Sequence, residues 1–350
     1  MRPGPAFQRA VGRAPKARLA LLLATGSALA GCSSSQSLVG TGLPSLTKSC
    51  ASGLSQVGTQ QVPISEETTK AGPVVVVTIC IDRKGPYPFA VSTGAGASVI
   101  SPALQRSLKL QTASAPVAIR GATCTSEAPA VAVQSLTLAG ISLAPQHLLV
   151  ASVPAFGTGQ PSDGVIGSDV LSRFGAVRID YRSKTLTLAR SEEPAPTGNV
   201  FILGQSTARP PSGLVKSAPE VGAVLDVIES PANTLISSAV TMSGQKKSFL
   251  IDSGSPNSVV ATTTSSSLGL APGQGAADKS GIGCSGTVST FSSGPWVLGT
   301  SALPNVSLLS ETFVGIANKG IDGALGSDVL SSYHSVVIDY GGAHLWLGAG

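Results

Sequence analysis

The sequence predicts an all-β protein built from two similar lobes, and three observations lead to that prediction. Its 350 residues include 41 Gly and 24 Pro, a content typical of short strands joined by many turns. The run VVVVTICI at 74–81 is rich in β-branched residues, which favour strands. A segment at 163–172 also recurs at 322–331, which divides the chain into two comparable halves.

The internal repeat sets the domain organisation. DGVIGSDVLS at 163–172 and DGALGSDVLS at 322–331 share eight of ten residues. A repeat this long is far beyond a solenoid unit, so it describes two lobes related by a pseudo-two-fold axis. Three more anchors keep the same offset to within one residue: Ile-Asp-Tyr at 179–181 and 338–340, FAVSTG at 89–94 with FLIDSG at 249–254, and Cys124 with Cys284.

These anchors give the expected boundaries of the lobes. We expect a first lobe at 71–190, a second lobe at 216–350 and a linker at 191–215. The linker contains Glu-Glu-Pro-Ala-Pro and Arg-Pro-Pro, and proline-rich stretches of this kind interrupt regular structure. Short helices are expected only near 102–108 and 169–173.

The amino-terminal residues predict export. Basic residues without any acid are followed by LALLLATGSALA at 19–30, an apolar run shorter than the about 20 residues that span a bilayer. Leu-Ala-Gly precedes Cys32, which resembles the lipobox of bacterial lipoproteins, where the cysteine is lipidated. The resemblance implies a signal peptide at 1–31, a lipid anchor at Cys32 and a flexible tether at 32–70. The alternative is a cleaved signal with an incidental cysteine.

This resemblance also implies a place in the cell. A lipidated Cys32 would anchor the chain to a membrane of the bacterial cell envelope. In a Gram-negative host we expect the outer membrane, because the next residue is Ser33 rather than aspartate.

Charge and residue types exclude several classes of partner. Five of the 23 basic residues lie within 1–31, and the remaining 18 equal the 18 acidic residues in number. No basic surplus is left to attract nucleic acid. We also expect no metal and no cofactor, since the chain has three histidines and no closely spaced cysteine pair.

A short motif in the second lobe carries the chemistry. An apolar strand ends in Asp252-Ser-Gly-Ser, and Ala-Leu-Gly follows at 324–326. With the duplication, this order and spacing resemble the pepsin/retropepsin aspartic peptidases over roughly residues 71–350. The resemblance implies that each lobe contributes one Asp-Thr/Ser-Gly loop and that the two loops meet at the axis. The loop residues carried over are Thr93 and Gly94 in the first lobe and Ser253 and Gly254 in the second.

The first lobe departs from this pattern, because Ser92 stands where the family has its first aspartate. Two adjacent carboxylates share one proton, so that one acts as base and the other as acid. A serine cannot share that proton, and losing one such group costs about 10²–10⁴ in rate. We therefore predict an impaired peptidase that serves as a peptide- or protein-binding module. Two alternatives stay open, an active aspartic endopeptidase using Asp252 with another group, and a structural envelope protein that binds nothing.

Two other ways to restore catalysis are weaker. A dimer could pair Asp252 with its copy in a second chain, but the tethered first lobe competes at an effective concentration on the order of millimolar. Ser92 could act as a nucleophile only with a base, and no histidine lies nearby in the sequence.

Four cysteines remain for disulfides in an exported chain. The family resemblance places Cys124 and Cys284 on the flaps, the hairpins that cover the cleft. We expect these two to be joined across the flaps, with Cys50–Cys80 as the second bridge. Four cysteines permit three pairings, so the other two stay open. A tied flap would hinder the entry of a polypeptide and favours the binding role.

Overall fold

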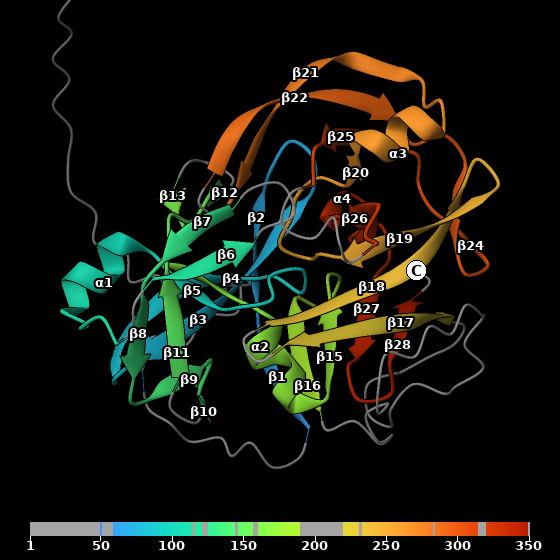
Figure 1. Ribbon diagram of the computed structural model, residues 1–350. Helices are drawn as coiled ribbons and strands as arrows, with labels where there is room; N and C mark the ends of the chain where they lie inside the picture. Colours follow the sequence, from blue (N-terminus) through green and yellow to red (C-terminus); the bar gives the residue numbers. More distant parts are fainter. Residues whose placement is uncertain are drawn as a thin grey trace, which may run out of the picture. The chain divides into compact units, whose positions relative to one another are not determined.

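The computed structural model describes residues 50, 59–113, 116–120, 125–143, 146–156, 160–189, 220–230, 233–282, 284–313 and 320–348. The expected signal peptide, the lipidation site Cys32, the linker at 191–215 and Cys124 lie outside the described residues. The described chain is predominantly β-sheet with a few short helices, an all-β bilobal architecture (Figure 1). None of the described helices combines the length and the apolar character needed to cross a membrane.

The first lobe is a mixed sheet in the order β10-β9-β3-β4-β14-β5-β11-β8, with β2 paired to β3. Its longest strand, β3, is buried along almost its whole length, as its β-branched sequence predicts. The elements are β2 (Ser65–Thr68), β3 (Pro73–Ile81), β4 (Lys84–Val91), β5 (Val99–Ile100), α1 (Pro102–Leu108), β6 (Val117–Arg120), β7 (Thr125–Ala128), β8 (Ala130–Val133), β9 (Leu136–Leu138), β10 (Ile141–Leu143), β11 (Gln146–Val150), β12 (Ala155–Phe156), β13 (Gln160–Pro161), β14 (Gly164–Ile166), α2 (Ser168–Leu171) and the 3₁₀ turn η1 (Ser172–Phe174).

The second lobe repeats this plan. Its sheet runs β18-β19-β26-β20-β25-β22-β21, with β23 paired to β18 and β24. The elements are β18 (Asn233–Met242), β19 (Gln245–Ile251), β20 (Val259–Ala261), α3 (Thr262–Ser267), β21 (Pro272–Gly281), β22 (Cys284–Ser292), β23 (Trp296–Leu298), β24 (Ser301–Ala302), β25 (Ser307–Glu311), β26 (Gly323–Leu325) and α4 (Ser327–Leu330).

A central sheet joins the lobes in the order β1-β16-β15-β27-β28-β17, and the strands lie side by side in Figure 1. The strands are β1 (Gln60–Pro63), β15 (Ala176–Asp180), β16 (Thr185–Ala189), β17 (Glu220–Ser230), β27 (Ser335–Asp339) and β28 (His344–Gly348). The two strands that carry the repeated Ile-Asp pair antiparallel, from Ala176 opposite Asp339 to Asp180 opposite Ser335. The repeat therefore meets itself at the middle of the molecule, as a pseudo-two-fold axis requires.

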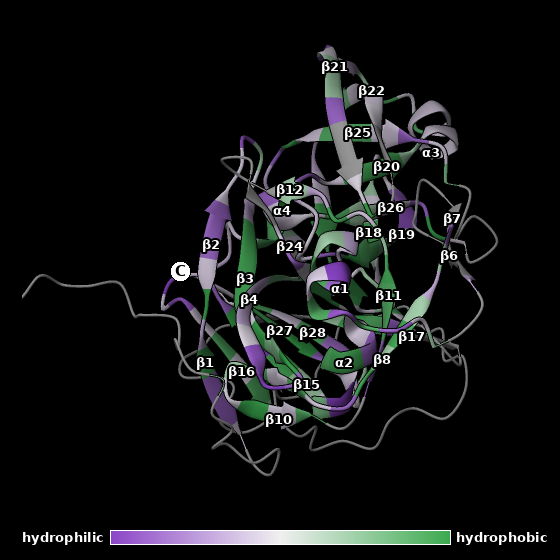
Figure 2. Cartoon of the chain, turned by 90° about the vertical axis from the view of Figure 1, so that its left-hand side faces the viewer, coloured by the Kyte–Doolittle hydropathy of each residue, from purple (hydrophilic) through white to green (hydrophobic). Residues whose placement is uncertain are grey.

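The predicted end of the tether at residue 70 is wrong, because β1 and β2 lie within residues 60–68. β1 pairs with β16 and β2 pairs with β3, and Val62 and Ile64 are buried. In Figure 2 the hydrophilic strand β2 lies beside the hydrophobic β3. Cys50 is joined to Cys80 of β3 by a disulfide, the pairing that we expected as the second bridge. The body of the protein thus includes residues that the sequence assigned to the tether.

Candidate active site

The pseudo-two-fold axis brings the two loops of the repeat together. Ser92 follows β4 and Asp252 follows β19, so both occupy the same place in their lobes. The Ser92 Oγ donates a hydrogen bond of 2.8 Å to Oδ1 of Asp252. The two residues that the sequence placed at equivalent positions are therefore direct neighbours.

The hydroxyl residues that follow tie the two loops to each other. The Thr93 hydroxyl donates to the carbonyl oxygen of Ile251 at 2.7 Å, and the Ser253 hydroxyl donates to that of Val91 at 3.0 Å. The backbone N–H of each residue donates to the hydroxyl of the other, at 3.1 Å from Ser253 and 3.3 Å from Thr93. Both side chains are buried, so these four bonds form away from competing water.

The glycines of the loops permit this close approach. A Cβ atom at Gly94 would overlap the Asp252 side chain, and one at Gly254 would overlap the Cβ of Ser92. Glycine is required at both positions because each loop packs directly against a side chain of the other loop, Asp252 beside Gly94 and Ser92 beside Gly254. Thr93, Gly94, Ser253 and Gly254 thus lie where the two loops meet.

Burial and hydrogen bonding shift the pKa of Asp252 in opposite directions. Burial raises the pKa of its carboxyl, because a low-dielectric setting disfavours the charged form. Hydrogen bonds from the Ser92 hydroxyl and from backbone amides, including that of Gly254 at 2.9 Å, oppose the rise. The net pKa is raised, so burial supplies part of the effect that a second carboxylate would produce by repulsion.

The Ser92 hydroxyl forms hydrogen bonds within and between the two loops. Its side chain donates to Asp252 and accepts from the backbone N–H of Ala95 at 3.0 Å, and the residue is 8% exposed. Neither of these two partners, within the described part of the chain, is a histidine. A serine nucleophile would need such a base, so the arrangement does not favour nucleophilic catalysis by Ser92.

A second pair of polar contacts, which sequence reasoning missed, supports each loop from behind. The Ser98 hydroxyl donates to Asp169 at 2.7 Å and accepts from the N–H of Gly167. The Ser258 hydroxyl makes the same two bonds, to Asp328 at 2.7 Å and from the N–H of Gly326. The signal was available, because the serines are 160 residues apart and the Gly-Ser-Asp segments repeat.

The long hairpin of the second lobe reaches the first lobe. Ile282 lies in the turn between β21 and β22, the arching pair at the top of Figure 1. It packs against an apolar cluster of the first lobe that contains Val99 and Ala128, and Ala95 of the first-lobe loop packs against the same cluster. Cys284 begins β22, but Cys124 lies outside the described residues, so the expected bridge between them stays a prediction.

The fold and the site define the class of protein. The family model described as Aspartyl protease matches residues 75–170 and 238–329, one segment in each lobe and more than half of the chain. The chain belongs to this family. Among solved structures, the crystal structure of aspartic proteinase from Irpex lacteus is similar at 13% sequence identity, with a TM-score of 0.44, over 83% of this chain and 97% of that chain. The search of curated proteins found no significant match.

The described residues offer no alternative centre based on a metal ion. No group of three or more His, Cys, Asp or Glu side chains in that part of the chain is placed to hold one.

Proposed function

We propose that this protein is a lipid-anchored envelope protein whose aspartic-peptidase fold binds a peptide or protein segment and is impaired as a peptidase. The observation that carries the proposal is the hydrogen bond between the Ser92 hydroxyl and the Asp252 carboxylate. The Ser92–Asp252 pair at the pseudo-two-fold axis contains one carboxylate, whereas the reaction of the family uses two.

The chemical consequence follows from the proton inventory of the pair. Peptide hydrolysis needs a base to activate water and an acid to protonate the product side, and a dyad sharing one proton supplies both. Asp252 can be base or acid but not both in one step, and the Ser92 hydroxyl is too weak an acid to replace its partner. We expect a loss of about 10²–10⁴ in rate from the missing group.

Two further features support binding as the remaining role. The Thr93 and Ser253 side chains make four hydrogen bonds between the loops and the glycines pack closely, so the two loops that would underlie a bound segment are held in place. The tip of the β21–β22 hairpin packs on the first lobe. An extended segment would bind beneath this hairpin. The lipobox-like residues before Cys32 would hold the module at the envelope.

A second function, active aspartic endopeptidase, is favoured by one observation. Burial raises the pKa of Asp252, so the carboxyl keeps its proton into less acidic solution than an exposed aspartate does. A protonated Asp252 could serve as the acid if another group supplied the base. This alternative predicts acid-dependent hydrolysis without any change in the sequence.

The substitution Ser92→Asp tests the proposal. Because the loops are otherwise complete, we expect this variant to gain peptide hydrolysis with an acidic optimum, about 100-fold or more above the wild type. The activity should be blocked by pepstatin, the aspartic-peptidase inhibitor, and should vanish in Ser92→Asp combined with Asp252→Ala. Ser92→Asn is the matched control, since it has the size of aspartate but no acidic proton.

The same assays separate the two functions. Binding of pepstatin to the wild type without hydrolysis of test peptides supports the binding module. Acid-dependent, pepstatin-sensitive hydrolysis by the wild type that is lost in Asp252→Ala would instead establish the endopeptidase and overturn the proposed impairment.

A further inference from the structure

An apolar cluster of the first lobe borders the candidate site. We call it the first-lobe face, and its buried members are Val74, Ala90, Val99, Ala128, Ala151 and Val165. Ala95 packs against this face, and the N–H of Ala95 donates to Oγ of Ser92 at 3.0 Å. A side chain that lies on the face is therefore close to the loop that carries Ser92.

The second lobe has an equivalent cluster. Ala90 pairs with Val165 in the first lobe as Leu250 pairs with Ala324 in the second, and each pair belongs to the cluster of its own lobe. Alanine with valine fills less space than leucine with alanine. These two positions are therefore filled less completely in the first lobe.

A further position differs in the same direction. Leu149 and Leu309 lie at the same place in their lobes, because each pairs in parallel with the short strand that follows its site loop. Val153 follows Leu149 at the same spacing as Phe313 follows Leu309, and both belong to the packing of their clusters. Since valine is much smaller than phenylalanine, the first-lobe face leaves room for a side chain from elsewhere.

Ile282 of the other lobe takes up this room. It lies in the turn between β21 and β22, is half-buried, and packs against the first-lobe face as Val153 does. The second-lobe cluster receives Ala277 and Val288 instead, which come from its own hairpin. Partial burial of an isoleucine side chain favours the seated hairpin tip over the free tip by about tenfold.

We propose that Ile282 is an internal competitor of the bound segment, and that the first-lobe face accepts an aliphatic side chain of that segment once Ile282 leaves. The inference rests on the proposed binding function and names the class of peptide that the site takes. A segment that crosses the loops of Ser92 and Asp252 passes this face and places a side chain on it. Isoleucine, leucine or valine would replace the contacts of Ile282, whereas a charged side chain would lose its hydration among alkyl groups.

Two labelled peptides test the competition. They are heptapeptides with blocked ends, identical except for the central residue, which is isoleucine in one and glycine in the other. Their flanking residues are alanine and serine, and their binding to the full-length chain is measured by fluorescence anisotropy. The isoleucine peptide competes with Ile282 for the face, but the glycine peptide has no side chain to place there.

The variant Ile282→Ala should free the face. We expect the isoleucine peptide to bind this variant about tenfold more tightly than the wild type, because its competitor is gone. The affinity of the glycine peptide should not change. Ile282→Leu is the matched control, since leucine keeps an aliphatic side chain at the tip, and both affinities should stay at their wild-type values.

The variant Val153→Phe should fill the face, because it places there the residue that the second lobe has as Phe313. We expect it to displace Ile282, so that backbone amides of residues 272–292 exchange with solvent about tenfold faster. This readout needs no peptide. Combined with Ile282→Ala, the same substitution should abolish the gain in affinity of the isoleucine peptide.

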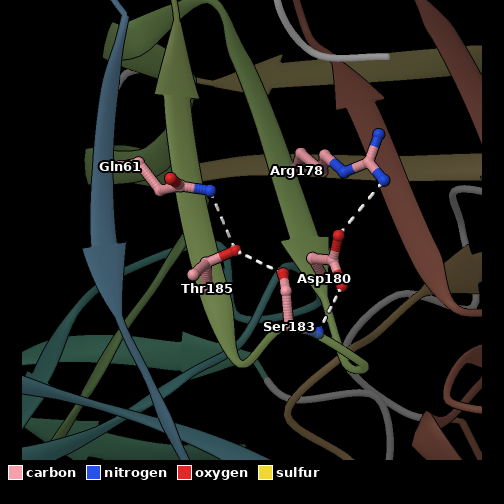
Figure 3. A network of polar contacts seen from close by, with 5 residues as sticks. All are labelled: Gln61, Arg178, Asp180, Ser183 and Thr185. Carbon is pink, nitrogen blue, oxygen red and sulfur yellow. Dashed lines mark hydrogen bonds and ion pairs between the residues drawn. The ribbon is translucent and has the colours of Figure 1, made fainter. Parts of the chain in front are cut away.

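A distant polar contact provides the control for general loosening of the fold. Gln61 of β1 donates to Thr185 of β16 at 3.1 Å, within the network that Figure 3 shows together with Ser183 and Asp180. β1 and β16 lie at the bottom of Figure 1, and the β21–β22 hairpin lies at the top. Gln61→Ala should therefore change neither the affinities of the two peptides nor the exchange of the hairpin.

Every protein is also measured with Cys284→Ser, because the expected bridge at the tip would hinder its movement, and the results in that background decide. The inference is overturned if Ile282→Ala leaves the affinity of the isoleucine peptide unchanged, or raises that of the glycine peptide equally. Unchanged hairpin exchange in a folded Val153→Phe variant also overturns it. If neither peptide binds any of these proteins, the inference fails, and binding of pepstatin to the wild type then shows whether the proposed binding function stands without it.

Discussion

The Ser92–Asp252 pair shows how one residue changes the chemistry of a symmetric site without changing its shape. The hydroxyl takes over two roles that a carboxylate at position 92 would fill, a bond to the opposite loop and acceptance of the Ala95 amide. It cannot hold an acidic proton. Geometry and protonation are therefore separable at this site, which is why the loops persist although the dyad is incomplete.

At the scale of a residue, the raised pKa of Asp252 predicts a pH-dependent stability. Its pKa is raised in the folded protein, so this group contributes stability below the pKa of the unfolded chain and loses it as pH rises through the folded pKa. We expect Asp252→Asn to be more stable than the wild type at pH 7, by about 1.4 kcal/mol for every pH unit that separates the folded pKa from the unfolded one. The gain should vanish near pH 3. Urea unfolding of both proteins across this range measures it.

The exposed Asp278 on the β21–β22 hairpin provides the control for this experiment. Asp278→Asn removes one negative charge without touching the site, so it reports the effect of net charge alone. An Asp252→Asn variant that is less stable than the wild type at pH 7 would show that the hydrogen bonds to the ionised carboxylate outweigh its burial.

At the scale of an element, the sequence predicted secondary structure correctly where a segment's own residues determine it. The prediction failed where pairing with a distant strand determines it. The β-branched run of β3 and the repeated Ser-Thr-Gly and Asp-Ser-Gly turns specify their own structure, so the central strand and both site loops could be foreseen. β1 and β2 are polar and short, and they are strands only because β16 and β3 pair with them. Nothing within 60–68 predicts those partners.

The same reasoning applies to side-chain environments. Ile-Asp-Tyr is identical in both copies, yet the Tyr340 hydroxyl is hydrogen-bonded to Ser168 whereas the buried Tyr181 hydroxyl has no partner among the described residues. The counterpart of Ser168, which is Ser327, also has no hydrogen-bond partner among the described residues. A repeat predicts equivalent backbones, but it does not predict what the neighbouring elements leave open.

The β21–β22 hairpin carries a prediction at this scale. Its tip is held to the first lobe by the half-buried Ile282, whose burial is worth about 1–1.5 kcal/mol. We expect Ile282→Asp to release the tip, so that backbone amides of residues 272–292 exchange with solvent about tenfold faster. Hydrogen exchange read by mass spectrometry measures this, with Ile282→Leu as the control that keeps the contact. Unchanged protection in Ile282→Asp would mean that the hairpin is held by other contacts.

At the scale of the whole molecule, the two lobes share both a sheet and a core. β15 of the first lobe pairs with β27 of the second over five residues, and five hydrogen bonds that involve Ser92, Thr93 and Ser253 connect the loops at the axis. One hydrophobic cluster contains buried residues of both lobes, among them Phe89 and Phe249. Neither lobe can open without exposing part of the other, so the molecule should unfold as a unit.

Phe89 and Phe249 allow a matched test of this cooperativity. They are equivalent in the repeat, both are fully buried, and each packs where Gly164 or Gly323 leaves room for its ring. We expect calorimetry to show one unfolding transition, and Phe89→Leu and Phe249→Leu each to lower its midpoint temperature. The lost volume should reduce the free energy of unfolding by on the order of 1–2 kcal/mol. Phe249 should cost somewhat more, because its ring also makes an edge-to-face contact with Trp296 at 5.9 Å. If the lobes were independent, each substitution would split the transition into two, with the altered lobe melting first and the other unchanged.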